Sequence, residues 1–169
     1  MAVVEYEIHM VDKTFLDNWH KTPDPWGYKT TPDDAVRKAK ILNALGGVRF
    51  EKALDIGAGE GWITKDLPAE TIHAIELSDI ASERIEWPVT RVPCPIGTYD
   101  LITATGVLYD DYEWESIIDI ILKHATGTIL TCNIASWEKG IERLGRPVFE
   151  TTFPYRTYKE HLCIFSVTT

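Results

Sequence analysis

The sequence predicts an α/β protein in which a mostly parallel sheet carries helices on both faces. Apolar stretches of strand length alternate with segments of helical spacing from residue 32 onward. Those apolar stretches are nearly continuous, which is typical of strands that are buried on both faces. The first strand ends in an acid followed by closely spaced glycines, the layout of a strand-to-helix turn that approaches a ligand.

The first predicted regular element is a helix that follows an irregular segment over residues 1–31. Thr31-Pro32-Asp33-Asp34 supplies a capping residue, a proline in the first turn and two acids that face the helix dipole. Apolar residues at helical spacing follow, and Gly46-Gly47 ends the element. We therefore expect one helix between these two signals.

The remaining elements follow from the alternation of apolar and polar segments. They are predicted as strand 53–58, helix 61–67, strand 71–77, helix 80–86, strand 88–92, strand 99–105, helix 112–124, strand 127–133 and helix 136–145. Val148–Phe153 and Leu162–Val167 form two last strands, joined through Pro154-Tyr155-Arg156, a connection short enough for an antiparallel return. We expect a single domain over residues 1–169, with 1–31 as an arm and 32–169 as the core.

Composition narrows the class of protein. The chain has 26 acids against 17 bases and no basic run, so its surface repels phosphate backbones and nucleic acid is not an expected partner. It contains no apolar stretch long enough to span a membrane and no signal-peptide layout, so we expect a cytoplasmic protein. Cys94, Cys132 and Cys163 are widely spaced, which favours reduced thiols, and no metal-site spacing is recognisable.

The glycine turn carries the strongest functional signal. An apolar run ends in Asp55, three glycines follow at alternate positions up to Gly61, and a second apolar run ends fifteen residues later in Glu76. A dinucleotide fingerprint requires a third glycine where this chain has Trp62, and Asp55 would repel a diphosphate but suits a cation. A carboxylate at Glu76 can accept hydrogen bonds from both ribose hydroxyls. The alternatives are a plain turn with incidental glycines and a surface acid; the spacing favours a nucleoside site.

The pattern Asp55–Gly61, D-x-G-x-G-x-G, resembles motif I of the class I S-adenosylmethionine-dependent methyltransferases. Tyr99-Asp100-Leu101 resembles the start of their fourth strand. Asp24-Pro25-Trp26-Gly27-Tyr28 and Val107-Leu108-Tyr109 are most similar to the NodS-like small-molecule methyltransferases. The resemblance implies a Rossmann-like sheet of seven strands whose antiparallel last strand lies between the fifth and sixth. The chain departs from the pattern at Val92-Pro93-Cys94-Pro95, which lacks the acid that often meets adenine, and it lacks large inserts.

The resemblance implies S-adenosylmethionine as cofactor and S-adenosylhomocysteine as product. Asp55 then faces the methionine ammonium, Gly57–Gly59 let the backbone approach the ligand, Glu76 binds the ribose and Leu77 packs on the adenine. The expected cofactor site comprises Trp26, Tyr28, Asp55, Gly57, Ala58, Gly59, Glu60, Gly61, Glu76, Leu77, Pro93, Cys94, Thr105 and Gly106.

Two parts of this expected site have further interpretations. Pro93 and Cys94, after the third strand, are candidates for the adenine edge. Trp26 and Tyr28 are equally compatible with a lid, whose aromatic faces attract a sulfonium, and with ordinary packing of the arm on the core.

Methyl transfer mainly requires an in-line nucleophile and the exclusion of water. A general base is needed only where the nucleophile carries a proton of unfavourable pKa. Tyr109 and His20 are the candidate catalytic residues, and Asp110 and Asp111 are further base candidates. A plainer interpretation makes His20 a solvated side chain and the two acids a helix cap. We expect Tyr109 to line the methyl channel, because its place after the fourth strand is fixed by the motif.

The predicted function is methyl transfer to an oxygen or nitrogen of a small metabolite such as a sugar or saccharide. Thr105-Gly106-Val107-Leu108 stands where nucleic-acid amino methyltransferases carry Asp/Asn-Pro-Pro-aromatic, which argues against that substrate class. The alternative is a domain that keeps the fold and binds S-adenosylmethionine or S-adenosylhomocysteine without transfer. The acceptor and the oligomeric state stay open.

Overall fold

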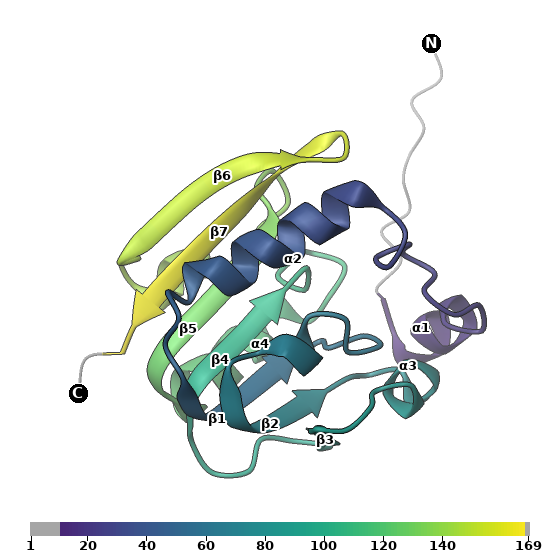
Figure 1. Ribbon diagram of the computed structural model, residues 1–169, viewed down its shortest axis with the longest axis horizontal. Helices are drawn as coiled ribbons and strands as arrows, with labels where there is room; N and C mark the ends of the chain where they lie inside the picture. The colour runs from purple at the N-terminus through teal and green to yellow at the C-terminus, as the bar shows by residue number, and fades with distance from the viewer. Residues whose placement is uncertain (1–10, 168–169) are drawn as a thin grey trace.

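The computed structural model describes residues 11–167, which contain a seven-stranded sheet with helices on both faces (Figure 1). The strands are β1 Phe50–Ile56, β2 Ala69–Ile75, β3 Val89–Arg91, β4 Tyr99–Thr105, β5 Ala125–Ile134, β6 Phe149–Tyr155 and β7 Tyr158–Ser166. The helices are α1 Lys13–Trp19, α2 Pro32–Ala44, α3 Asp79–Glu83 and α4 Trp114–His124, with short 3₁₀ turns η1 Thr64–Asp66 and η2 Ile141–Leu144.

The strand order is β3-β2-β1-β4-β5-β7-β6. The first five strands of this order pair in parallel, whereas β7 pairs antiparallel with both β5 and β6. The predicted fold class and the insertion of β7 between β5 and β6 are therefore confirmed. Because β1, β2, β4 and β5 are parallel, their carboxyl ends meet at one edge of the sheet, where ligands bind in open α/β sheets.

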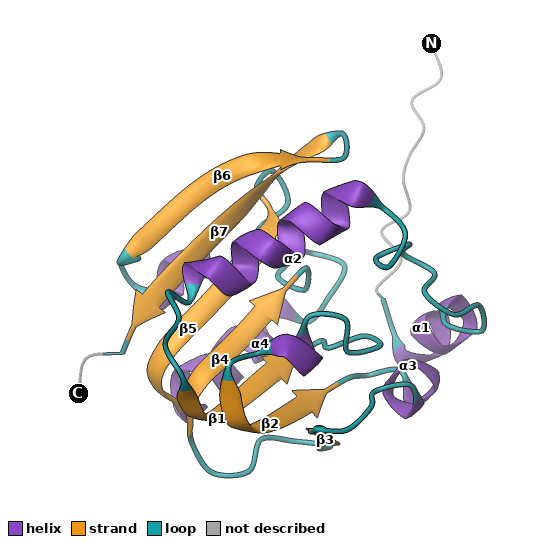
Figure 2. Ribbon diagram, viewed as in Figure 1, coloured by secondary structure: helices purple, strands orange, loops and turns teal. Residues whose placement is uncertain are grey.

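The core forms two layers, one on each face of the sheet. Successive strand residues point to opposite faces: Ala53 packs in the cluster that contains Ile41 of α2, and Leu54 in the cluster that contains Ile118 of α4. Figure 2 shows α2 in front of the sheet and α4 behind it. This burial on both faces explains why the strands are nearly continuously apolar.

Helix α2 lies where the sequence predicts it. It begins at Pro32 with Asp33 and Asp34 in its first turn, and Gly46 and Gly47 follow its end with φ angles of 64° and 72°. Glycine adopts this left-handed conformation without the steric penalty of a side chain, which is why the helix ends there.

The segment predicted as irregular contains a helix, so that prediction is wrong for residues 13–19. The carboxylate of Asp12 caps α1 by accepting from the backbone N of Phe15 at 2.8 Å, and Lys13 Nζ lies 2.6 Å from Asp17 Oδ2 one turn later. Asp17 also accepts from Ser78 Oγ at 2.7 Å, which holds α1 beside α3. Residues 1–10 of the predicted arm lie outside the described part.

Two predicted helices are much shorter than expected. The segment 61–67 forms only η1, because Pro68 disfavours a helical conformation at Leu67, which is extended with ψ at 134°. The segment 136–145 forms only η2, because Gly140 interrupts it with φ at 72°. A Cβ at Gly140 would lie 2.5 Å from the ring of Trp114, so this position requires glycine.

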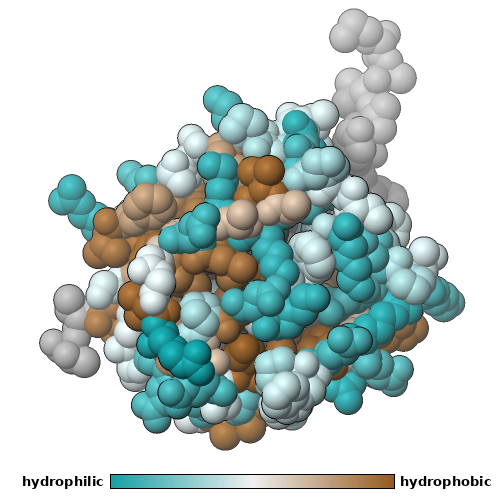
Figure 3. Space-filling model, viewed as in Figure 1, coloured by the Kyte–Doolittle hydropathy of each residue, from teal (hydrophilic) through white to brown (hydrophobic). Residues whose placement is uncertain are grey.

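The visible surface is predominantly polar. Figure 3 shows hydrophilic side chains over most of the face viewed, with hydrophobic ones between them mainly on the side of β6 and β7. Among residues 11–167, no helix combines the length and apolar character needed to cross a membrane.

Candidate active site

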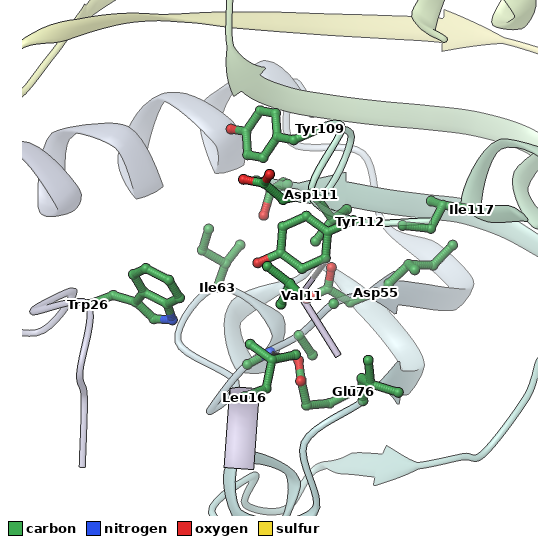
Figure 4. A pocket seen from close by; sticks show the side chains of 18 of the residues that line it. Val11, Leu16, Trp26, Asp55, Ile63, Glu76, Tyr109, Asp111, Tyr112 and Ile117 are labelled. Carbon is green, nitrogen blue, oxygen red and sulfur yellow. Dashed lines mark hydrogen bonds between the residues drawn. The ribbon is translucent and has the colours of Figure 1, made fainter. Parts of the chain in front are cut away.

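A cavity of about 920 Å³ opens at the carboxyl ends of the parallel strands. Its walls come from the segments after β1, β2 and β4, from the chain between α1 and α2, and from the β6–β7 hairpin. Figure 4 shows Trp26 on one wall, Ile117 on the opposite one, and Asp55 and Glu76 facing the space between them. A cavity of this size accommodates a ligand of drug or nucleoside size with room for a second small molecule.

Asp55 lies at the end of β1, buried, with both carboxylate oxygens hydrogen-bonded. Thr103, its register partner on β4, donates to Oδ1 at 2.7 Å, and Thr64 donates to Oδ2 at 2.6 Å. Burial raises the pKa of Asp55 to about 6, although the two hydroxyl donors oppose the shift. A buried carboxylate with a raised pKa is stabilised by a cation, so the site suits a cationic ligand group.

Glu76 follows β2 and joins two loops. Its Oε2 accepts from the backbone N of Gly59 at 2.7 Å, and its Oε1 accepts from the backbone N of Ser78 at 2.9 Å. A carboxylate oxygen accepts more than one hydrogen bond, so both oxygens keep capacity for ligand hydroxyls. Leu77, the next residue, lines the cavity and is half-exposed.

The glycines of the turn after β1 have different roles. A Cβ at Gly57, where φ is 75°, would lie 2.3 Å from Val107 Cγ1, so packing within the protein already requires glycine there. At Gly59, where φ is 56°, no atom of the described chain outside its two neighbours lies within 4 Å of a Cβ. Gly59 lines the cavity together with Ala58, and a side chain there would enter the space available to a ligand.

Glu60 lines the cavity, but its carboxylate bonds to the protein. It accepts from the backbone N of Asp24 at 3.1 Å and from Arg84 Nη1 at 2.6 Å, and its Oε1 lies 3.1 Å from His20 Nδ1. Burial opposes ionisation, but the hydrogen bonds from these three groups outweigh it and lower the pKa of Glu60. Glu60 thereby ties the segment after α1 to the glycine turn.

Trp26 and Tyr28 line the cavity, and the loop that holds them is fixed by Asp24. The Asp24 carboxylate accepts from the backbone N of Tyr28 at 2.8 Å and of Lys29 at 3.0 Å, a local turn typical of aspartate. Trp26 also packs on Trp19, with ring centroids 5.3 Å apart. Trp26 thus packs within the predicted arm, and both aromatic residues line the cavity; the lid over a cofactor stays a prediction.

Of the two catalytic candidates, His20 is buried rather than solvated and lines the cavity beside Glu60. Tyr109 also lines the cavity, and its Oη accepts from the backbone N of Ile134 at 2.8 Å. Burial raises the pKa of Tyr109 well above its usual range. Tyr109 therefore keeps its proton near neutral pH and can donate a hydrogen bond, but it is a poor general base.

The acids after β4 do not cap the next helix, because the N-cap of α4 is Glu113. Asp110 pairs with Lys139 at 3.0 Å, whereas Asp111 lines the cavity, as Figure 4 shows. Thr105 and Gly106, at the end of β4, also line it. Thus the segment after β4 contributes a wall of the cavity, and the place of Tyr109 at a methyl channel stays a prediction.

Three expected residues are not brought to the cavity. Pro93 and Cys94 are exposed, and the described lining includes neither of them. Strand β3 ends at Arg91, so these residues follow beyond it as an exposed loop. Gly61 is likewise outside the described lining; a Cβ there would lie 3.5 Å from Ile85, so its contact is with the protein.

Polar residues on the other side of the cavity belong to no motif recognised in the sequence. Arg37 of α2 donates from Nε to Glu160 Oε1 at 3.0 Å and from Nη2 to the carbonyl of Cys132 at 3.2 Å. Its Nη2 lies 3.7 Å from the Cβ position of Gly106. Arg37 follows Asp34 by one helical turn, so two charges on the core-facing stripe of α2 were an available signal. Glu160 had no comparable local signal.

Comparison with known proteins agrees with this geometry. No protein-family model matches the chain, and no curated protein matches it by sequence. Solved structures match it closely in shape, and their strand arrangement defines the class I S-adenosylmethionine-dependent methyltransferase fold, which this chain has.

Two of these structures show how far the similarity extends. The N-methyltransferase NodS from Bradyrhizobium japonicum WM9, solved with S-adenosyl-L-homocysteine, gives a TM-score of 0.79 at 16% identity over 93% of this chain and 98% of that one. Magnesium protoporphyrin IX methyltransferase (ChlM) from Synechocystis PCC 6803, solved with bound SAM, gives 0.73 at 14% identity over 94% and 98%. At these identities the similarity establishes the fold.

Proposed function

We propose that this chain is an S-adenosylmethionine-dependent methyltransferase that acts on an oxygen or nitrogen of a small metabolite. The observation that carries the proposal is the meeting of Asp55, Gly59 and Glu76 in one cavity at the carboxyl ends of β1 and β2. Similar folds that contain S-adenosylhomocysteine or SAM support the choice of nucleoside.

The proposed cofactor roles follow from the donors and acceptors available. Asp55 offsets the charge of the methionine ammonium, directly or through water, and Glu76 accepts from the ribose hydroxyls. Gly59 allows the ligand to approach the backbone, and Leu77 packs against the adenine. Trp26 covers the sulfonium side, where an aromatic face attracts a cation.

The acceptor binds on the side of the cavity beyond Gly106. Tyr109, Trp137, Tyr155 and Tyr158 line this side, and aromatic side chains with polar tips suit a ring that also carries hydroxyl or amino groups.

Charges on this side are paired. Arg37 bonds to Glu160, and Arg156 Nη2 lies 2.6 Å from Asp34 Oδ2. Arg37 and Arg156 are thus each paired with a carboxylate, and the described lining of the cavity holds more acids than bases. These charges support a neutral polar metabolite such as a sugar over a strongly anionic one such as a phosphate.

Proton transfer, where the acceptor requires it, is assigned to His20. Its Nδ1 faces the Glu60 carboxylate, an arrangement that leaves Nε2 as the acceptor nitrogen of the neutral ring. Tyr109 is proposed as a hydrogen-bond donor that orients the acceptor, because its proton is retained.

Calorimetric titration of the purified chain with S-adenosylmethionine, S-adenosylhomocysteine and NAD in parallel tests the cofactor. Binding of both sulfur nucleosides with no response to NAD is expected. Binding of NAD alone, or no binding of any of the three, contradicts the proposal.

The alternative function is a binding domain without transfer. Pro93 and Cys94 lie outside the described lining, so the expected adenine edge is incomplete, and this observation favours the alternative. Release of S-adenosylhomocysteine on addition of sugars and amines separates the two functions. A chain that binds the nucleoside but releases no product with any acceptor is the binding domain.

A further inference from the structure

A cluster of potential metal ligands lies on the β6–β7 hairpin, away from the cavity. His161 and Cys163 are two residues apart on β7 and therefore share a face, and Glu150 of β6 is the register partner of Cys163. The described lining of the cavity includes none of the three. The cluster is therefore separate from the proposed active site.

The three potential ligand atoms converge. His161 Nε2 lies 3.1 Å from Cys163 Sγ and 3.6 Å from Glu150 Oε2, and all three atoms lie within 4.8 Å of one another. Ligands of a tetrahedral zinc ion are separated from each other by about 3.5 Å, given zinc–ligand bonds of about 2.0–2.3 Å. Small side-chain adjustments suffice to place an ion between them.

A fourth residue orients the histidine. Glu138, in the segment after β5, has its Oε2 2.6 Å from His161 Nδ1, and its Oε1 accepts from Asn133 Nδ2 at 3.2 Å. A carboxylate on one ring nitrogen directs the other nitrogen to the metal and raises its basicity, which is the usual outer arrangement of a metal-binding histidine. A histidine held this way presents Nε2 toward Cys163 and Glu150.

Thr131 is an independent indication of a missing partner. It is the register partner of Cys163 on β5 and is fully buried, and its hydroxyl has no hydrogen-bond partner among the described residues. A thiolate accepts a hydrogen bond more strongly than a thiol does. Deprotonation of Cys163 by a metal would therefore provide an acceptor beside this donor.

We propose that Glu150, His161 and Cys163 bind one zinc ion, with water in the fourth position. Thiolate, imidazole and carboxylate are the ligand types that zinc takes, and the site is exposed to solvent through Glu150. Binding converts the Cys163 thiol to a thiolate and releases its proton to solvent, while a zinc–sulfur bond forms. An ordinary cysteine thiol is mostly protonated at neutral pH, so this proton release is measurable there.

The test is a titration of the full, tag-free chain with zinc in competition with a chromogenic chelator, followed by cobalt substitution. We expect one equivalent to bind, with one proton released and a thiolate-to-cobalt charge-transfer band in the near ultraviolet. Cys163→Ser should abolish the band, and His161→Ala should weaken zinc binding at least tenfold. Cys94→Ser is the matched control, because Cys94 is the exposed cysteine and should leave both signals unchanged.

Glu150→Gln tests the site without the risk of misfolding that the buried Cys163 carries, because Glu150 is exposed and its replacement leaves the core intact. We expect it to weaken zinc binding severalfold with an unchanged circular dichroism spectrum. Three results overturn the proposal: no bound zinc in the wild-type chain, a cobalt band that survives Cys163→Ser, or a band that disappears with Cys94→Ser. Each result is independent of the nucleoside titration, so the metal site and the proposed function stand or fall separately.

Discussion

Replacement of Gly59 by alanine separates ligand binding from backbone strain. Gly59 has φ at 56° and lines the cavity, and no atom of the described chain outside its two neighbours lies within 4 Å of a Cβ placed there, so we expect the added methyl to take up space at the cavity wall. The left-handed conformation costs an alanine about 1–2 kcal/mol, which lowers the Tm of a chain of this size by about 2–8 °C. Steric conflict with a bound ligand costs about 1–3 kcal/mol more, so the Kd for S-adenosylhomocysteine should rise by about five- to 150-fold.

Gly46→Ala is the matched control for this variant. Gly46 has φ at 64°, also without described atoms within 4 Å of its Cβ position, and it lies between α2 and β1 at the opposite edge of the sheet. It should lose the same stability as Gly59→Ala and bind the nucleoside normally. Calorimetry and thermal unfolding on both variants measure the two effects. Equal affinity in Gly59→Ala and Gly46→Ala would refute the close approach of ligand to backbone.

Three further predictions concern charge and hydrogen bonding. Because the pKa of Asp55 rises from 3.8 to about 6 on folding, the protonated form is favoured in the folded state, and stability falls by on the order of 3 kcal/mol as pH rises between these values. Asp55→Asn should remove this pH dependence from the free energy of unfolding, which denaturant titrations at several pH values measure. Unfolding free energies of the wild type and of Asp55→Asn that change in parallel with pH contradict the assignment. Arg37→Met should lower the free energy of unfolding by about 3–5 kcal/mol, because Glu160 loses its cationic partner. The double variant with Glu160→Leu should recover most of this loss, whereas additive losses from the two substitutions argue against a coupled pair. Tyr109→Phe should lower the free energy of unfolding by about 1–3 kcal/mol, because the buried N–H of Ile134 loses its acceptor. The Kd for S-adenosylhomocysteine should stay within about twofold of the wild-type value. An unchanged free energy of unfolding is the contrary result.

The sequence predicted the strands because both faces of the sheet are buried. β4, Tyr99–Thr105, has the predicted bounds, and Glu76 directly follows β2, whose end was predicted two residues too late. The position of β7 between β5 and β6 came from the family resemblance, since periodicity distinguishes strands from helices but carries no strand order. The predictions of the helices 61–67 and 136–145 were wrong because a single residue, such as Pro68, interrupts an otherwise helical pattern.

The part of the site that the sequence did not predict is built from pairs of residues that are far apart in sequence. Arg37 and Glu160 are 123 residues apart, and no local pattern connects them. Glu60 was expected at the cofactor because it lies within the glycine motif, whereas its carboxylate holds His20 and the backbone of Asp24. The motif identified a loop that lines the cavity but could not show which of its side chains bind protein and which face the cavity.

The loops after β1 and β4 are locked to each other and to β5. Asn133 is fully buried, and its Oδ1 accepts from three consecutive amides, those of Gly106 at 3.1 Å, Val107 at 3.2 Å and Leu108 at 3.3 Å. Val107 in turn occupies the space that a Cβ at Gly57 would require. A substitution at Gly57 therefore disturbs both loops and cannot isolate ligand binding. Gly59 contacts neither Val107 nor Asn133 in this way, so its substitution reports on the cavity while the framework that forms it stays intact.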